Sequence, residues 1–233
     1  MVAVDVAIGP VAVEMTHTET HSETASSLTK PTTGKLPAPR PVRIGGALAI
    51  SQLGRLLLLA LVAIAAISAS LAAAPGILGV LGAVLAVLMI SIAVIDWRSF
   101  IIPDPLTIAG LVLAVVHAAA QEPDAMLRAV AIAALRGTAL ALVFLIIRYA
   151  YSRIRGKQGL GLGDVKLAGV AGAWLGWSML PIVVDVAAFT ALSAYLLRQF
   201  VFGRPMRATN RVPFGLFLAP AIWLCWLLET MLL

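Results

Sequence analysis

Residues 76–96 have the sequence GILGVLGAVLAVLMISIAVID, an uncharged run that ends in a single aspartate. An α-helix needs about 20 apolar residues, at about 1.5 Å each, to cross the hydrocarbon core of a bilayer. This run has that length, and it carries no charged face that could lie against water. The stretch therefore predicts a membrane-spanning helix with Asp96 at one end.

The whole chain shares this apolar character. Of its 233 residues, 61% are hydrophobic and 12% are charged, whereas about a quarter of the residues of a soluble domain are charged. That composition excludes an ordinary soluble enzyme, and the single cysteine, Cys225, excludes an intrachain disulfide and a four-cysteine zinc site. We therefore predict an all-α, polytopic membrane protein. Seven transmembrane helices are predicted, at residues 54–74, 76–96, 104–121, 128–150, 161–179, 181–202 and 214–232.

The N-terminal segment differs from the rest of the chain. Residues 1–44 are rich in threonine, serine, proline and glutamate, and they have no apolar periodicity that could form a core. We predict a disordered tail over residues 1–44 and a transmembrane domain over residues 45–233.

Lysine and arginine residues determine the predicted orientation, because the cytoplasmic loops of membrane proteins are enriched in both. If the tail lies in the cytoplasm and the helices alternate, only Arg128 falls in an external loop. The prediction is a cytoplasmic N-terminus and an external C-terminus. The net charge of +6 then reflects cationic loops beside a lipid bilayer, and no nucleic-acid partner is expected. The residues predicted to lie inside are Lys30, Lys35, Arg40, Arg43, Arg98, Arg153, Arg155, Lys157, Arg204, Arg207 and Arg211.

Two acidic motifs fall at predicted cytoplasmic ends of helices. The sequence IDWRSFIIPD (95–104) closes the second predicted helix, and GLGLGDVKL (159–167) opens the fifth. Asp96 and Asp164 are therefore expected at the same depth, where two carboxylates can form a general acid and base pair. The glycines before Asp164 leave room for an extended substrate. The alternative is that both aspartates cap helices in solvated loops; their matched depth favours the catalytic interpretation.

These motifs resemble those of the type IV prepilin peptidases, a family of GxGD intramembrane aspartyl proteases. The family pattern is an aspartate followed by Ile/Leu-Pro-Asp/Asn, and then a distant Gly-x-Gly-Asp-x-Lys. The sequence also contains VPFG (212–215), which is similar to the Pro-Phe-Gly motif of the family, and the resemblance covers roughly residues 76–220. The residues that match these motifs are Asp96, Pro103, Asp104, Gly161, Gly163, Asp164, Lys166, Pro213 and Gly215.

The resemblance implies that Asp96 and Asp164 are the catalytic pair of an aspartic endopeptidase that needs no metal or other cofactor. It implies a multi-pass protein of the bacterial cytoplasmic membrane. Its substrates would be prepilins and pseudopilins, whose short basic leader is removed at the cytoplasmic face after a glycine. The other motif residues are expected to support the substrate channel.

Many bacterial members also carry an N-terminal insert with two Cys-x-x-Cys pairs, and many N-methylate the mature pilin. This sequence has neither such pairs nor a binding signature for a methyl donor. It resembles the compact, peptidase-only members that serve tight-adherence (Flp-type) pili.

Simpler roles are expected for several other polar residues. Asp104 follows Pro103 and is expected to cap the third predicted helix, and Lys166 is expected to extend to the membrane interface. Asp185 and Arg136 both fall within predicted membrane segments, where ionisable groups are usually paired, and they are candidates for such a contact.

Two other classes of function stay open. A small transporter or channel would use Asp96, Asp164 and Asp185 as a polar path across the membrane. A scaffold subunit of a secretion apparatus would need neither Asp96 nor Asp164, so its function would not depend on them.

Overall fold

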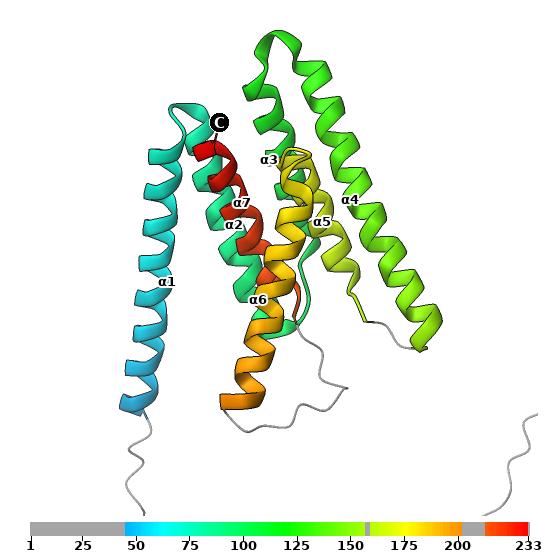
Figure 1. The fold of residues 1–233 in the computed structure, drawn as a ribbon. Helices are drawn as coiled ribbons and strands as arrows, with labels where there is room; N and C mark the ends of the chain where they lie inside the picture. Colours follow the sequence, from blue (N-terminus) through cyan, green and yellow to red (C-terminus); the bar gives the residue numbers. More distant parts are fainter. Residues whose placement is uncertain (1–44, 157–158, 202–212, 233) are drawn as a thin grey trace, which may run out of the picture. The chain divides into compact units, whose positions relative to one another are not determined.

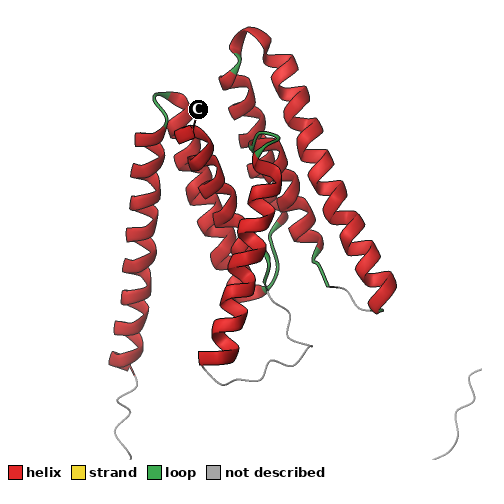
Figure 2. Cartoon of the chain, in the orientation of Figure 1, coloured by secondary structure: helices red, strands yellow, loops and turns green. Residues whose placement is uncertain are grey.

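The computed structural model describes residues 45–156, 159–201 and 213–232, and the tail predicted at residues 1–44 lies outside them. The described residues form helices joined by short loops (Figures 1 and 2), which confirms the predicted all-α class. The elements are α1 (Gly45–Ala73), α2 (Ile77–Ser99), α3 (Asp104–Gln121), the short 3-10 helix η1 (Pro123–Ala125), α4 (Met126–Arg155), α5 (Leu162–Trp174), α6 (Met179–Val201) and α7 (Gly215–Leu232).

Six of the described helices are long and apolar enough to cross a membrane, so the protein is polytopic. The exception is α5, whose 13 residues extend over about 20 Å, less than the roughly 30 Å of a hydrocarbon core. The helix predicted at 161–179 is therefore shorter in the structure, where it covers Leu162–Trp174.

The reason for this difference is the position of α5 among the other helices. It packs against α3, α4 and α7, and every residue from 167 to 175 is buried. A helix that is apolar on all sides lies either in lipid or inside a protein, and hydropathy alone does not separate the two. α5 is apolar because protein surrounds it.

Glycines allow α4 and α5 to approach closely. A Cβ on Gly172 would lie 2.5 Å from the carbonyl oxygen of Arg136, and one on Gly137 would lie 2.8 Å from the carbonyl oxygen of Gly169. Small residues at such crossings let two backbones pack directly against each other. This crossing fixes α5, and with it Asp164, against the longest helix of the bundle.

Gly172→Ala is expected to destabilise the fold, because the new methyl group meets backbone atoms that cannot turn away. Overpacking of this kind costs about 1–3 kcal/mol. Thermal unfolding in detergent should give a lower Tm than wild type. Gly54→Ala is the matched control, since nothing lies within 4 Å of a Cβ at that position, and an unchanged Tm for Gly172→Ala would contradict the packing described here.

The C-terminal ends of α5 and α7 are held together by polar contacts. The backbone N–H of Gly176, just after α5, donates to both carboxylate oxygens of Glu229, at 3.1 and 3.3 Å. Arg136 interacts electrostatically with Glu229. Its guanidinium also lies near Gly176, because a Cβ added to that glycine would be 4.0 Å from Arg136 Nη1. The candidate contact between Asp185 and Arg136 is thus not formed: the acidic neighbour of Arg136 is Glu229.

Candidate active site

Asp96 lies in the last turn of α2, with its side chain turned into the bundle. It is 4% exposed, and its Oδ2 accepts a hydrogen bond of 2.9 Å from the backbone N–H of Leu216, in the first turn of α7. α2 ends at Ser99, where the next residue, Phe100, adopts the left-handed conformation (φ 55°) and donates its N–H to the Asp96 carbonyl at 2.9 Å. The chain then turns away and leaves the carboxylate facing the start of α7.

Asp164 lies in the first turn of α5. Its Oδ2 accepts a hydrogen bond of 3.1 Å from the N–H of Gly161, so it does cap its own helix, as the alternative interpretation held. It is nevertheless only 8% exposed, whereas a capping residue in a solvated loop would be open to water. The side chain therefore combines a helix cap with a buried carboxyl group.

The start of α7 connects the two aspartates. Leu216 donates its N–H to Asp96, and the N–H of the preceding residue, Gly215, interacts with Asp164. The N-terminal N–H groups of a helix favour negative charge. A Cβ on Gly215 would lie 2.8 Å from Asp96 Oδ2 and 2.7 Å from Ile102 Cδ1, so a larger residue would displace the ends of these side chains.

Burial changes the acidity of Asp164. Asp164 lies on α5, which is not among the candidate membrane spans. Burial raises the pKa of Asp164 to about 6, and the negative charge of Asp96 raises it further. Three groups oppose this increase and lower the pKa of Asp164: the N–H groups of Gly161 and Gly215, and the guanidinium of Arg148. The carboxyl group thus binds its proton more firmly than an ordinary aspartate, and it interacts with Asp96.

Both carboxylates line one pocket of about 300 Å³. It lies where α2 ends and where α3 and α5 begin. These helix ends are in the lower part of Figure 1. Six of the nine motif residues line it, and Gly215 contacts Asp96 from the side of α7. Pro103 and Pro213 precede the first residues of α3 and α7. The lining residues are Asp96, Phe100, Ile101, Ile102, Asp104, Gly161, Leu162, Gly163, Asp164 and Lys166.

At the rim of this pocket, Asp104 and Lys166 form an ion pair. Lys166 Nζ lies 2.5 Å from Asp104 Oδ1, and the two side chains are 47% (Lys166) and 64% (Asp104) exposed. Asp104 is the first residue of α3, directly after the N-cap residue Pro103, and the pairing of its side chain with Lys166 was not predicted from the sequence. The pair joins the first turns of α3 and α5.

A larger pocket of about 500 Å³ lies between α1 and α2, but apart from Ser91 its lining is aliphatic. Such a groove has no titratable group for catalysis. Among the described residues, no group of three or more His, Cys, Asp and Glu side chains could hold a metal ion. The acidic pocket is therefore the candidate active site.

The contribution of Arg148, on α4, was not predicted from the sequence. Its guanidinium Nη1 donates to the carbonyl oxygen of Leu160, in the loop before α5. The signal available in the sequence was a charged residue near the end of an apolar segment, a position that often marks a functional site. Which group it contacts could not be read from the sequence.

The described structure thus belongs to a multi-pass, all-α membrane protein in which two buried aspartates share a pocket at one end of the helices. Residues 83–196 match the type IV leader peptidase family. This part of the chain is therefore similar to that family, as the sequence motifs predicted.

Individual relatives agree with this assignment. The chain is 33% identical over 144 residues to a prepilin leader peptidase/N-methyltransferase of Aeromonas hydrophila. The aligned region covers 58% of this chain and 45% of that protein. It is 31% identical over 135 residues to the protein of the same name from Escherichia coli strain K12, covering 56% and 55%. It is 41% identical over 78 residues to leader peptidase HopD of Escherichia coli, covering 34% and 50%. The chain spans about half the length of these relatives, and no solved structure matches it.

Proposed function

We propose that this protein is an aspartic endopeptidase of the bacterial cytoplasmic membrane that removes the leader peptide from prepilin-type substrates at the cytoplasmic face. The observation that carries the proposal is the pairing of two buried carboxylates in one pocket, each beside an N–H group of the first turn of α7. The family match and the names of the relatives support a leader peptide as the substrate.

In the proposed mechanism, Asp96 and Asp164 share one proton. Two carboxylates that interact in a buried site do not ionise independently, so one carries the proton while the other is charged. The ionised carboxylate takes a proton from a water molecule while the oxygen of that water attacks the carbon of the scissile carbonyl. The protonated carboxyl donates a hydrogen bond to the carbonyl oxygen, and a proton then passes to the leaving nitrogen as the C–N bond breaks.

The N–H groups of Gly215 and Leu216 have a clear part in this mechanism. They are backbone groups with fixed directions, so they hold the two carboxylates in place without needing to reorganise during the reaction. Gly161 and Gly163 line the pocket beside Asp164 and add no side chains to it, which suits an extended peptide.

The direct test is cleavage of a prepilin by the purified full-length protein in lipid, followed by mass spectrometry of the products. We expect loss of the leader and a new N-terminus just after a glycine. An intact substrate, in a preparation whose Tm shows a folded protein, would overturn the proposal and favour the transporter or the scaffold.

The proposed orientation has its own test. Reporter fusions after Lys157 and Arg207, both outside the described residues, should report a cytoplasmic position, and fusions after Asp124 and at the C-terminus should report an external one. The reason is the excess of lysine and arginine in the loops expected inside. An external signal after Lys157 would place the start of α5, and hence Asp164, on the wrong side of the membrane.

The ion pair at the rim of the pocket is expected to matter much less than the buried pair. Asp104→Asn should lower the cleavage rate less than tenfold, because exposed ion pairs contribute about 0–1 kcal/mol. The check is kcat/KM for Asp104→Asn, Lys166→Gln and the double variant. A loss for Asp104→Asn as large as that for Asp164→Asn would instead place Asp104 in the chemistry.

A further inference from the structure

A chain of hydrogen bonds leads from α4 to Asp164. Arg148 donates to the carbonyl oxygen of Leu160, and the N–H of Gly161 donates to Asp164 Oδ2 at 3.1 Å. The C=O of residue 160 and the N–H of residue 161 belong to one peptide group. A single peptide therefore connects the arginine to the carboxylate.

The physical effect of this arrangement follows from the polarity of the peptide group. A cationic donor on the carbonyl oxygen polarises the peptide, and this polarisation strengthens the hydrogen bond that its N–H donates. Arg148 is partly buried, so water screens its charge less than it would screen that of an exposed side chain.

We propose that Arg148 is a positioning residue of this site, which acts through the Leu160–Gly161 peptide to hold the Asp164 carboxylate in place. The role in catalysis rests on the proposed peptidase function, whereas the effect on Asp164 does not. The guanidinium also anchors the glycine-rich loop to α4, in addition to the close crossing of α4 and α5 deeper in the bundle.

Other charged groups also act on Asp164. Asp96 faces it from α2, and the ion pair of Asp104 (α3) and Lys166 (α5) lines the same pocket. α7 contributes the N–H of Gly215. In this set, Arg148 reaches Asp164 both through space and through a peptide group.

Arg148 is expected to stabilise the ionised form of Asp164. A positive charge and a stronger N–H donor both stabilise the carboxylate, so their removal makes the proton of Asp164 harder to lose. In Arg148→Gln, the alkaline limb of the cleavage profile should move to higher pH by about one unit, a typical size for the loss of a nearby opposite charge. Arg148→Lys keeps the charge and one donor, and should move the limb by less than half as much.

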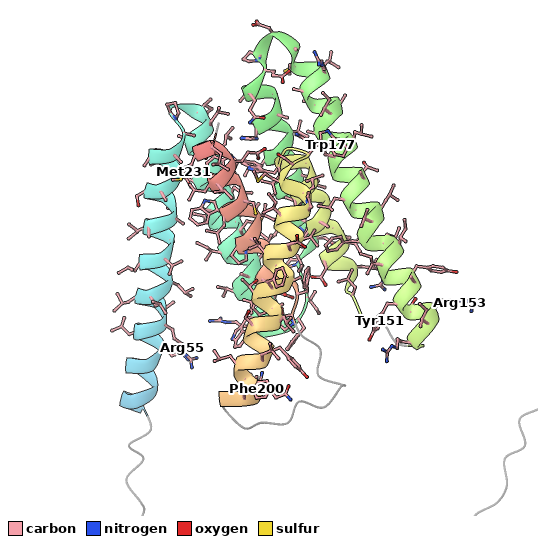
Figure 3. All side chains as sticks on the ribbon, viewed as in Figure 1. Arg55, Tyr151, Arg153, Trp177, Phe200 and Met231 are labelled. Carbon is pink, nitrogen blue, oxygen red and sulfur yellow. The ribbon has the colours of Figure 1, made fainter. Side chains whose placement is uncertain are left out.

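The experiment compares Arg148→Gln, Arg148→Lys and the matched control Arg153→Gln in the full-length protein. Arg153 lies on the same helix and is exposed on its outer side (Figure 3), so its removal should not move the limb. Arg148→Met, which keeps the apolar stem, serves as a second neutral variant if Arg148→Gln does not accumulate.

A second readout does not depend on cleavage. Infrared titration of the carboxyl C=O band in the substrate-free protein, with Asp164→Asn to assign the band, should show Asp164 retaining its proton to higher pH in the neutral variants. This measurement tests Arg148 even if no prepilin is cut. Wild-type titration of Asp164 in both neutral variants, or an equal shift in Arg153→Gln, would overturn the proposal.

Discussion

Asp164→Asn is expected to lower the rate of leader cleavage by about 10²–10⁴-fold, the usual contribution of a general acid or base. Asparagine has nearly the same size, and its side-chain oxygen still accepts the hydrogen bond from the N–H of Gly161. The start of α5 should therefore stay folded while ionisation at this position is lost. Cleavage of a prepilin measured beside the Tm separates these two effects.

Asp96→Asn should have an effect of similar size, and the double variant should be little worse than either single variant. The reason is that two groups sharing one proton act as a unit, so their losses do not add. Asp185→Asn is the matched control, because Asp185 lies exposed on α6 and does not line the pocket. A wild-type rate for Asp164→Asn would exclude the aspartyl mechanism, and a defect in Asp185→Asn alone would favour a polar path across the membrane.

The sequence predicted the parts of this site that depend on local pattern. Asp96 at the end of an apolar run, and Asp164 after alternating glycines, were both expected at matching ends of helices, and the structure places both in one pocket. Depth in a bilayer follows from helix length, so two residues far apart in sequence can be assigned to the same level. The all-α class could be predicted because the apolar runs of the sequence have the length of membrane-spanning helices.

The sequence did not predict contacts that depend on which helices are neighbours. Hydropathy is the same for a helix in lipid and a helix surrounded by protein, so the buried position of α5 was missed. The contact of Glu229 with Gly176, and that of Arg148 with Leu160, join elements whose packing is set by the tertiary fold. The length of a side chain does not reveal which residue of another helix it contacts.

Lys166 and Asp104 illustrate the same limit at the surface. Both occur in the recognised motifs, and each had a plausible role on its own helix. The structure pairs them across the rim of the pocket, because the first turns of α3 and α5 start from the same end of the bundle. A motif thus identified the residues but not their contact.

Gly215→Ala is expected to lower cleavage by about 10²-fold, the cost of a displacement of about 1 Å in a catalytic group, while the fold is kept. The new methyl group would lie 2.8 Å from Asp96 Oδ2 and 2.7 Å from Ile102 Cδ1. Both atoms are the free ends of side chains, so they can move aside without disturbing the backbone. The carboxylate would then lose its hydrogen bond from Leu216 and its alignment with Asp164.

Two comparisons make this result specific. Gly172→Ala strains backbone atoms and should lower the Tm first, whereas Gly215→Ala should lower kcat with a Tm close to that of wild type. Gly54→Ala, which places its methyl group in open space, should change neither. Normal kcat in Gly215→Ala would mean that catalysis does not depend on the contact between the start of α7 and Asp96, and a Tm that falls as far as in Gly172→Ala would mean that Gly215 serves the fold instead of the carboxylate.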